Sequence, residues 1–368
     1  MVKILFFIEN LSAGGAEKVL QNLVNNMDSE KFDITVQTVW KGSPEGFLNE
    51  NIKYKYIYHT YSKINNYKYR LGALLKTIYP LHIKDDYDIE VAYLECGATK
   101  VISTSTNKKA KKVAWVHCDL SKKISNISEF KKKSVNWYKK FNKIVCVSKD
   151  VENSFKSIYG DEFDTQVLYN VIDDISIREK ATDAIEDFTF DKSIPTIVSV
   201  GRLSTQKRFD RLIEAHKLLS DQGISNRLLI IGEGDERATL EQLINASGTQ
   251  ETVTLAGFKS NPYPYIKNAD LLVCSSDYEG FSSFVAEGLI LGKAIVTTNC
   301  TGMEELLGDS QYGIITECNE KALADGIKSL LSDKGLKDAY ERKATERSKA
   351  FSIESSVAET EKLFNHIK

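Results

Sequence analysis

Two glutamates lie eight positions apart in the stretch YEGFSSFVAEGL, residues 278–289, on either side of a largely apolar run. A lone carboxylate is costly to bury unless it accepts hydrogen bonds. Sugar or ribose hydroxyls would supply such bonds to Glu287. The alternative, an exposed Glu287 on the outer face of a helix, stays open at this point.

A helix is expected to begin inside this stretch, because Ser282 and Ser283 are both favoured N-cap residues. Glu279 then lies in the loop before the helix. Gly280, Phe281 and Ser282 leave backbone N–H groups near the positive end of the helix. Such a terminus can bind a phosphate or another anionic group.

A second set of suitable residues lies in GRLSTQKRFDRLIEA, residues 201–215, directly after an apolar run. Arg202 follows that run at once, and Lys207 comes five positions later. Arginine gives a forked contact and lysine a compact charge, a combination suited to a diphosphate. A basic surface loop without a ligand is the alternative.

Two further turns contain paired glycines. In ENLSAGGAEKVL, residues 9–20, Gly14 and Gly15 would let the backbone approach a phosphate at the start of the next helix. In IIGEGDE, residues 230–236, the glycines either contact a ligand or only close a tight strand–helix connection.

These turns must be positioned by the elements around them. Short apolar runs alternate with amphipathic stretches, which predicts parallel sheets covered by helices on both faces. Strands are expected at 3–8, 32–39, 89–94, 112–117 and 143–148, and again at 196–201, 227–232, 252–257, 271–274 and 294–298. Helices are expected at 16–27, 70–78, 208–221, 235–247, 284–291, 319–332, 336–349 and 351–367. Ligands of such sheets bind at the carboxyl ends of the strands.

The boundary between two doubly wound α/β domains is expected in residues 172–194, an acidic stretch of weak periodicity. The N-terminal domain then comprises residues 1–172, with a final helix at about 351–368 added to it. The C-terminal domain comprises residues 190–350.

Composition agrees with a two-domain globular protein. The chain has 368 residues, of which 42% are hydrophobic and 27% charged. No apolar run approaches the length of a membrane span, and the start lacks the features of a signal peptide. Six scattered cysteines without a CxxC pair fit a reduced, cytoplasmic setting.

Joined in this order, the motifs resemble the retaining nucleotide-sugar glycosyltransferases of family 4, the glycosyl transferases group 1, in particular bacterial polysaccharide-assembly enzymes. The resemblance rests on GGAEK, WVHCD at 115–119, YNVID at 169–173, GRLSTQKRFDRLIEA, IIGEGDE and the E-x7-E pair, and covers nearly the whole chain. It implies the GT-B fold, in which two Rossmann-like domains face a central cleft. It also implies that the C-terminal helix crosses back to the N-terminal domain.

The resemblance assigns four catalytic positions. Arg202 and Lys207 would hold the donor diphosphate and stabilise the charge that grows on it. Glu279 would bind hydroxyls of the donor sugar. His117, at the end of an N-terminal strand, would face the transferred sugar, and a core histidine is the alternative.

The remaining positions implied by the resemblance bind the donor. Gly15 would approach the diphosphate from the N-terminal domain, the backbone around Phe258 would meet the base, and Glu287 would bind the ribose. The amides of Gly280, Phe281, Ser282 and Ser283 would bind sugar and phosphate.

The implied reaction moves a hexose or N-acetylhexosamine from a nucleotide sugar to a sugar acceptor, with a lipid-linked glycan expected. A UDP-sugar is the favoured donor and GDP-mannose the second choice. No cofactor is expected, no nucleic-acid partner, and no metal. Asp86-Tyr87-Asp88 matches the D-x-D pattern of metal-dependent enzymes, but it precedes a strand and so lies at the wrong end of the sheet.

Two other functions were weighed. An NAD-dependent dehydrogenase is disfavoured, because no G-x-G-x-x-G follows a strand. A non-catalytic GT-B partner protein is disfavoured because the donor residues are present.

Charge is distributed unevenly along the chain. Residues 1–170 contain 26 Lys and Arg against 19 Asp and Glu, a net +7, whereas the remainder carries a net −9. Lysines interleave with aromatic residues in 59–84 and 131–141, and residues 70–81 could form an amphipathic helix. The N-terminal domain is therefore expected to attach peripherally to the inner face of an anionic membrane, partly through Lys131, Lys132 and Lys133. A soluble enzyme whose lysines only keep it in solution is the alternative.

Overall fold

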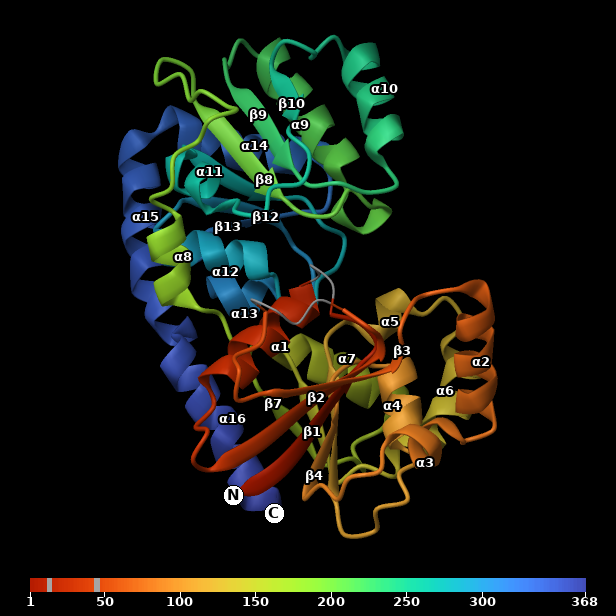
Figure 1. The fold of residues 1–368 in the computed structure, drawn as a ribbon. Coiled ribbons are helices and arrows are strands. Elements are labelled where there is room, and N and C mark those ends of the chain that lie inside the picture. The colour runs from red at the N-terminus through yellow and green to blue at the C-terminus, as the bar shows by residue number, and fades with distance from the viewer. Residues whose placement is uncertain (12–14, 43–46) are drawn as a thin grey trace. The chain divides into compact units, whose positions relative to one another are not determined.

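The computed structural model describes residues 1–11, 15–42 and 47–368 (Figure 1). Gly14 of the predicted phosphate-binding turn lies outside these residues. The chain divides into two compact units. One comprises residues 1–172 together with 353–368, and the other residues 173–352. We call them the N-terminal and C-terminal units.

A seven-stranded sheet forms the centre of the N-terminal unit. Its strand order is β3-β2-β1-β4-β5-β6-β7, and neighbouring strands are parallel. The strands are β1 Val2–Ile8, β2 Phe32–Trp40, β3 Lys53–Tyr58, β4 Ile89–Ala92, β5 Lys111–Val116, β6 Lys143–Cys146 and β7 Thr165–Val167. The central strands are almost entirely buried, as expected for a sheet covered on both faces.

Eight helices belong to this unit within the described residues. They are α1 Gly15–Asn26, α2 Lys63–Leu74, α3 Ile78–His82, α4 Gly97–Ile102, α5 Leu120–Lys123, α6 Ile127–Tyr138, α7 Lys149–Tyr159 and the C-terminal α16 Ile353–Ile367. The fully buried Phe364 of α16 packs edge-on against Phe6 and Phe32, with ring centroids 5.9 and 6.4 Å apart. The last helix is therefore part of the N-terminal core.

A six-stranded parallel sheet forms the centre of the C-terminal unit, in the order β10-β9-β8-β11-β12-β13. The strands are β8 Thr196–Val200, β9 Arg227–Ile231, β10 Val253–Leu255, β11 Leu271–Cys274, β12 Ile295–Thr298 and β13 Ile314–Thr316. The helices are α8 Asp174–Lys180, α9 Phe209–Asp221, α10 Arg237–Ser247, α11 Tyr263–Asn268, α12 Ser283–Ile290, α13 Met303–Leu307, α14 Glu320–Ser332 and α15 Lys334–Ser348. Two short 3-10 turns, η1 Thr205–Lys207 and η2 Lys349–Phe351, complete it.

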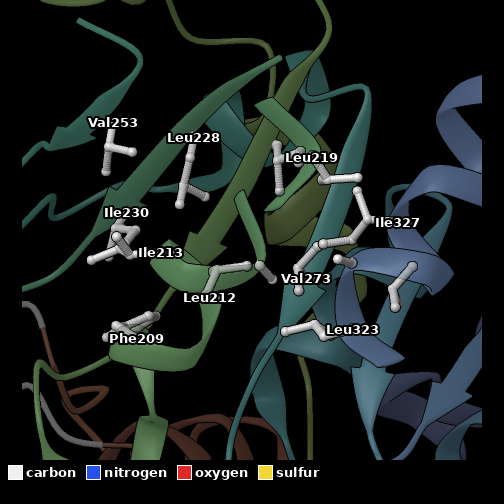
Figure 2. Close-up of a cluster of buried hydrophobic side chains, with 14 of the residues drawn as sticks. Phe209, Leu212, Ile213, Leu219, Leu228, Ile230, Val253, Val273, Leu323 and Ile327 are labelled. Atoms are coloured by element: carbon white, nitrogen blue, oxygen red, sulfur yellow. The ribbon is translucent and has the colours of Figure 1, made fainter. Parts of the chain in front are cut away.

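The C-terminal core fills the space between this sheet and helices α9 and α14 (Figure 2). Leu212 and Leu219 of α9 meet Val273 of β11 and Ile327 of α14, and all four side chains are fully buried. Apolar residues at helical spacing on α9 thus fix the helix that follows β8.

The predicted fold class is confirmed, since both sheets are parallel and covered by helices, and all ten predicted strands are present. Three edge strands were not predicted: β3, β7 and β13. The predicted helix over 70–78, extended to 81 as an amphipathic helix, is wrong. Helix α2 begins earlier and ends at Leu74, and Lys76 has a φ of 61°, which interrupts the helix before α3. The expected boundary segment contains helix α8.

All six cysteines are free. No helix within the described residues combines the length and the apolar composition needed to span a bilayer.

Candidate active site

The order in which the chain adds strands to the C-terminal sheet reverses between β8 and β11, and we call this point the change of direction of the sheet. From β8 the chain builds outward through β9 and β10, and from β11 it builds the other way through β12 and β13. Loops at the carboxyl ends of two such neighbouring strands leave a crevice where ligands of open α/β sheets bind. The two loops here are 201–208 and 275–282, which carry the predicted motifs.

Lys207 and Glu279 meet at this position. The Lys207 ammonium donates a hydrogen bond to Glu279 Oε1 at 2.6 Å, and Ser276 Oγ donates to the same oxygen at 2.7 Å. The side chains of Lys207 and Glu279 are 20% and 9% exposed. The structure therefore brings together two predicted site residues that are 72 positions apart in the sequence.

The pKa of Lys207 is raised by this arrangement. Burial acts to lower it, but the negative charge of Glu279 and its hydrogen bond outweigh burial. Lys207 is therefore a fixed positive charge at neutral pH. A diphosphate that reached it would find a cation held in a largely water-excluded position, where charge–charge attraction is strong.

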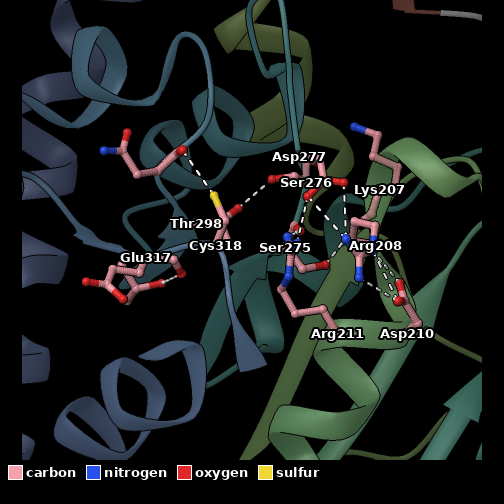
Figure 3. Close-up of polar contacts among 12 residues, drawn as sticks. Lys207, Arg208, Asp210, Arg211, Ser275, Ser276, Asp277, Thr298, Glu317 and Cys318 are labelled. Carbon is pink, nitrogen blue, oxygen red and sulfur yellow. Dashed lines mark hydrogen bonds and ion pairs between the residues drawn. The ribbon is translucent and has the colours of Figure 1, made fainter. Parts of the chain in front are cut away.

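Several hydrogen bonds tie the two loops together (Figure 3). Ser275 Oγ donates to the carbonyl of Lys207 at 2.8 Å, and the backbone N–H of Asp277 donates to the carbonyl of Gln206 at 3.0 Å. The Gln206 amide in turn donates to the carbonyl of Tyr278 at 2.7 Å. The position of Glu279 relative to Lys207 is thus fixed by the backbone on both sides.

Two arginines of the following helix region reinforce the link (Figure 3). Arg211, only 4% exposed, donates to the carbonyl of Ser275 at 2.9 Å and to Asp277 Oδ1 at 2.7 Å. Arg208 donates to Asp277 Oδ2 at 3.2 Å and to Asp210 Oδ2 at 2.9 Å. Asp277 therefore joins the start of α9 to the loop that carries Glu279.

Helix α12 begins as predicted, with Ser282 as its N-cap. The Ser282 hydroxyl accepts from the backbone N–H of Val285 at 3.5 Å. Gly280, Phe281 and Ser282 are buried, and Ser283 is half-buried. The positive end of α12 thus lies directly after Glu279, as the predicted anion-binding arrangement requires.

Glu287 lies one turn into α12 and is half-buried, so the alternative of a fully exposed outer position is wrong. It accepts a long hydrogen bond from the hydroxyl of Tyr263 at 3.4 Å. Burial, together with the charge of Glu287, raises the pKa of Tyr263. The tyrosine therefore remains a donor at any physiological pH.

Other predicted donor residues lie at solvent-facing positions. Arg202, directly after β8, is exposed and makes no hydrogen bond or ion pair with the described residues. Phe258 is 60% exposed. Gly15 is exposed at the first turn of α1, and a Cβ there would meet nothing within 4 Å. In the described part of the chain, neither Arg202 nor Phe258 makes a hydrogen bond or ion pair with Lys207 or Glu279, and Gly15 belongs to the N-terminal unit.

The glycines of residues 230–236 have a packing role. A Cβ on Gly232 would lie 1.8 Å from the carbonyl oxygen of Gly201, and one on Gly234 would lie 2.2 Å from that of Leu203. Only glycine lets this turn approach the backbone of the loop that carries Lys207. The tight strand–helix connection accounts for this motif without a ligand contact.

The N-terminal sheet has its own change of direction, between β1 and β4. Glu9 follows β1, and its Oε1 accepts a hydrogen bond from the Tyr69 hydroxyl of α2 at 2.9 Å. A Cβ on Gly97, after β4, would lie 1.9 Å from that same oxygen. Glycine at this position therefore makes room for the Glu9 carboxylate at the carboxyl end of the sheet.

A buried carboxylate, Glu95, lies beside this point. Its Oε1 accepts from Lys123 Nζ at 2.8 Å and from Cys118 Sγ at 3.1 Å, and its Oε2 accepts from the backbone N–H of His117 at 3.1 Å. Burial acts to raise the pKa of Glu95, but the charge of Lys123 and these bonds hold it at about 2. Glu95 is therefore ionised and fixes the backbone that carries His117.

His117 follows β5 as predicted, and its Nε2 is buried without a hydrogen-bond partner among the described residues. Its ring lies 4.8 Å from that of Tyr93. Burial lowers the pKa of His117 to about 4, although the charge of Glu95 opposes this. A neutral imidazole with an unpaired nitrogen has unused capacity for one hydrogen bond.

Two acidic motifs have structural roles. Asp119, next but one to His117, caps α5 and accepts from the hydroxyl of Ser121 at 2.6 Å. Asp88 of the D-x-D match accepts from the backbone N–H of Lys3 at 2.9 Å, at the amino end of β1. Within the described ranges, no group of three or more His, Cys, Asp and Glu side chains is arranged to hold a metal ion.

Sequence reasoning missed Glu9, Glu95, Tyr69, Arg211 and Asp277. Glu9 and Glu95 carry a signal that could have been used, because each is an acidic residue placed directly after a buried strand of the predicted sheet. Tyr69 and Arg211 carry no comparable signal, since their partners are distant in the sequence.

Comparison with known proteins gives a family match within the C-terminal unit. Residues 181–347 match the family described as Glycosyl transferases group 1. The N-acetylgalactosamine-N,N'-diacetylbacillosaminyl-diphospho-undecaprenol 4-alpha-N-acetylgalactosaminyltransferase of Campylobacter jejuni is 37% identical over 188 residues, 50% of this chain and 49% of that protein. The capsular polysaccharide biosynthesis glycosyltransferase CapM of Staphylococcus aureus is 27% identical over 169 residues, 45% of this chain and 44% of that protein. The chain thus spans about half the length of these curated relatives.

The fold extends the likeness to the whole chain. The crystal structure of Anabaena HepE in complex with UDP-glucose matches with a TM-score of 0.79 and 19% identity, over 100% of both chains. This likeness shows the fold, and confirms the predicted GT-B architecture.

Proposed function

We propose that this chain, whose residues 181–347 belong to the glycosyl transferases group 1 family, is a retaining glycosyltransferase that uses a nucleotide sugar. The donated sugar is a hexose or N-acetylhexosamine, carried by UDP, with GDP-mannose as the second choice. The acceptor is a lipid-linked glycan of bacterial cell-surface polysaccharide synthesis. The enzyme acts at the inner face of the membrane and needs no metal ion.

One observation carries the proposal. Lys207 and Glu279 form a largely buried ion pair at the change of direction of the C-terminal sheet, directly before the capped start of α12. This arrangement offers a cation and a helix N-terminus for a diphosphate, and a carboxylate for sugar hydroxyls.

Each residue then has a part in the reaction. The acceptor hydroxyl attacks the anomeric carbon on the face from which the diphosphate departs, and the departing phosphate oxygen takes the hydroxyl proton. Lys207 and Arg202 stabilise the charge that grows on that oxygen, which a fixed cation does without reorganisation. Glu279 orients the sugar, and Glu287 with Tyr263 holds the ribose.

The N-terminal unit is assigned to the acceptor. Its candidate groups for the acceptor are the Glu9 carboxylate and the Lys123 ammonium. The unpaired Nε2 of His117 is assigned instead to a hydroxyl of the transferred sugar. The lipid-linked acceptor is supported by the Campylobacter jejuni relative, whose name gives a diphospho-undecaprenol glycan as its acceptor.

The decisive experiment is a donor screen with the purified chain. Each donor is tested for thermal stabilisation of the protein and for slow release of the nucleoside diphosphate, UDP or GDP. The donors are UDP-glucose, UDP-galactose, the two UDP-N-acetylhexosamines and GDP-mannose. A donor at 100 times its dissociation constant adds about 2.7 kcal/mol to the unfolding free energy, a readable shift. NAD is tested in the same way. Stabilisation by NAD alone, or neither stabilisation nor nucleotide release with any donor, would overturn the proposal.

Retention is tested separately on the product. NMR of the anomeric proton in the new linkage should show the configuration of the donor. An inverted linkage would contradict the assigned mechanism while leaving the transferase activity standing.

A further inference from the structure

The outward face of helix α2 is apolar. Ile64, Tyr67, Leu71 and Leu74 recur at helical spacing and are 68%, 67%, 39% and 66% exposed. Residues spaced by three and four lie on one side of a helix, so these four form a continuous stripe. The stripe faces water in the protein as described.

The opposite face of α2 holds the helix to the unit. Tyr69 and Ala73, only 7% and 8% exposed, belong to the core cluster beneath it. Tyr69 also reaches Glu9 at the carboxyl end of β1. The usual arrangement of a surface helix is therefore reversed in number, because four large apolar side chains of α2 are exposed and only Tyr69 and Ala73 are buried.

The apolar surface continues beyond α2. Tyr61 before the helix is 67% exposed, Leu75 after it 62%, and Leu81 of α3 59%. Together these form what we call the α2 patch: Tyr61, Ile64, Tyr67, Leu71, Leu74, Leu75 and Leu81. The described residues include eleven exposed large hydrophobic side chains, and these seven fall within 21 consecutive positions. Exposed apolar residues this concentrated mark an interaction surface, whereas scattered ones do not.

Positive charge surrounds the patch. Residues 59–84 contain five Lys and Arg and no Asp or Glu. The five are all exposed: Lys63, Lys68, Arg70, Lys76 and Lys84. On a helical projection Lys63 and Arg70 lie on one side of the apolar stripe and Lys68 on the other. An apolar stripe flanked by cations fits the interface of an anionic bilayer, where the apolar side chains enter the lipid and the cations meet headgroups.

We propose that the α2 patch docks this protein on an anionic membrane surface. The proposal rests on the proposed function, because a lipid-linked acceptor is the reason why this protein would dock on a membrane. Helix α2 would link the membrane surface to the acceptor region, since one face of the helix carries the patch and Tyr69 on the other face donates to Glu9 at the change of direction of the N-terminal sheet. A second copy of the chain is a poorer occupant, because two patches facing each other would bring ten cations together.

The lysines of α6 are not part of this surface. Lys131, Lys132 and Lys133 are exposed, but Lys133 is paired with Glu129 at 2.5 Å, and no exposed large apolar side chain accompanies them. The docking surface is therefore the α2 patch, in place of the continuous helix and the lysine run expected from the sequence.

Vesicle co-sedimentation of the full chain tests the proposal. The variant Ile64→Gln/Leu71→Gln/Leu74→Gln removes the centre of the stripe and keeps residues favourable to a helix. The matched control Ile175→Gln/Leu336→Gln removes exposed apolar side chains of the C-terminal unit. We expect the unmodified protein to bind vesicles containing about a third phosphatidylglycerol. The α2 variant should lose at least roughly tenfold in partition coefficient, and the control should stay within about twofold.

Three outcomes would overturn the proposal. The first is unmodified protein that stays in the supernatant at low salt, and the second is an α2 variant that binds as well as the control. The third is a protein that dimerises through these residues without vesicles, as seen by sedimentation velocity. Vesicle binding uses no donor, so its failure is distinct from a failed donor screen. Circular dichroism and release of diphosphate from a donor should be unchanged in the α2 variant.

Discussion

Replacing Lys207 by methionine should separate binding of the diphosphate from binding of the nucleoside. The lysine stem passes over Gly201, where a Cβ would lie 3.2 Å from Lys207 Cε, so methionine keeps an unbranched side chain in that space. The substitution removes only the ammonium that donates to Glu279 at 2.6 Å. Affinity for UDP should fall while affinity for uridine should not.

The size of the effect follows from an exchange of partners. A charge-assisted hydrogen bond is worth about 1.5–3 kcal/mol. Lys207 must give up part of its hydrogen bond to Glu279 in order to reach a phosphate. The net gain from the phosphate contact therefore lies at the lower end of this energy range. A loss of about 1.5 kcal/mol weakens UDP roughly tenfold. Calorimetric titration at fixed ionic strength should show this, with uridine changed by less than about twofold.

The matched variant Glu279→Gln should move UDP affinity in the other direction. It keeps the shape of the side chain but removes the charge that competes for the Lys207 ammonium. Free UDP should therefore bind several-fold more tightly to this variant, although turnover falls. Equal losses for UDP and uridine in Lys207→Met, or weaker UDP binding in Glu279→Gln, would refute the assignment of Lys207 to phosphate.

The other predictions concern turnover, stability and pH. Glu279→Ala should lower turnover by roughly 10²–10³, as for loss of one preorganised contact, while the protein still unfolds cooperatively on heating. Unchanged turnover would remove Glu279 from the site. Arg211→Met removes the donor to the carbonyl of Ser275 and one of the two partners of the part-exposed Asp277, so urea unfolding should show a loss of about 1–3 kcal/mol, and a loss below about 0.5 kcal/mol would mean that the two loops are held by other bonds. The pKa of Glu95 is about 2 in the folded protein, below its ordinary value of 4.5, so its ionisation stabilises the fold above pH 4.5 and this contribution is lost as pH falls toward 2. Unfolding free energies from pH 5 to 2 should therefore decline by about 3 kcal/mol less in Glu95→Gln than in the unmodified protein, and parallel curves would argue against the ion pair with Lys123.

The strands that position the site were predictable because they are buried on both faces and read as continuous apolar runs. Strand β3 was missed because KYKYIY alternates lysine with tyrosine, and its half-buried edge position leaves no such run. Strands β7 and β13 have three residues each, too few for any periodic signal.

The site was predictable where its residues lie at the ends of predicted strands. Lys207 and Glu279 follow β8 and β11, and parallel neighbours bring such ends together. Local spacing gave no warning that Arg211 would reach Asp277, or that Tyr69 would reach Glu9, 60 residues away. The end of α2 was also missed, because a left-handed Lys76 is an uncommon conformation for a lysine.

The return of α16 to the N-terminal unit has a consequence for the order in which the protein is made. The strands of the N-terminal sheet are synthesised before α16. Phe6 and Phe32 can therefore pack against Phe364 only later, and the backbone N–H of Asp28 can donate to Glu361, at 2.7 Å, only later as well. The N-terminal unit is thus completed only after the C-terminal unit has left the ribosome. Loss of α16, which follows the C-terminal unit in the sequence, would damage the N-terminal unit and spare the C-terminal one.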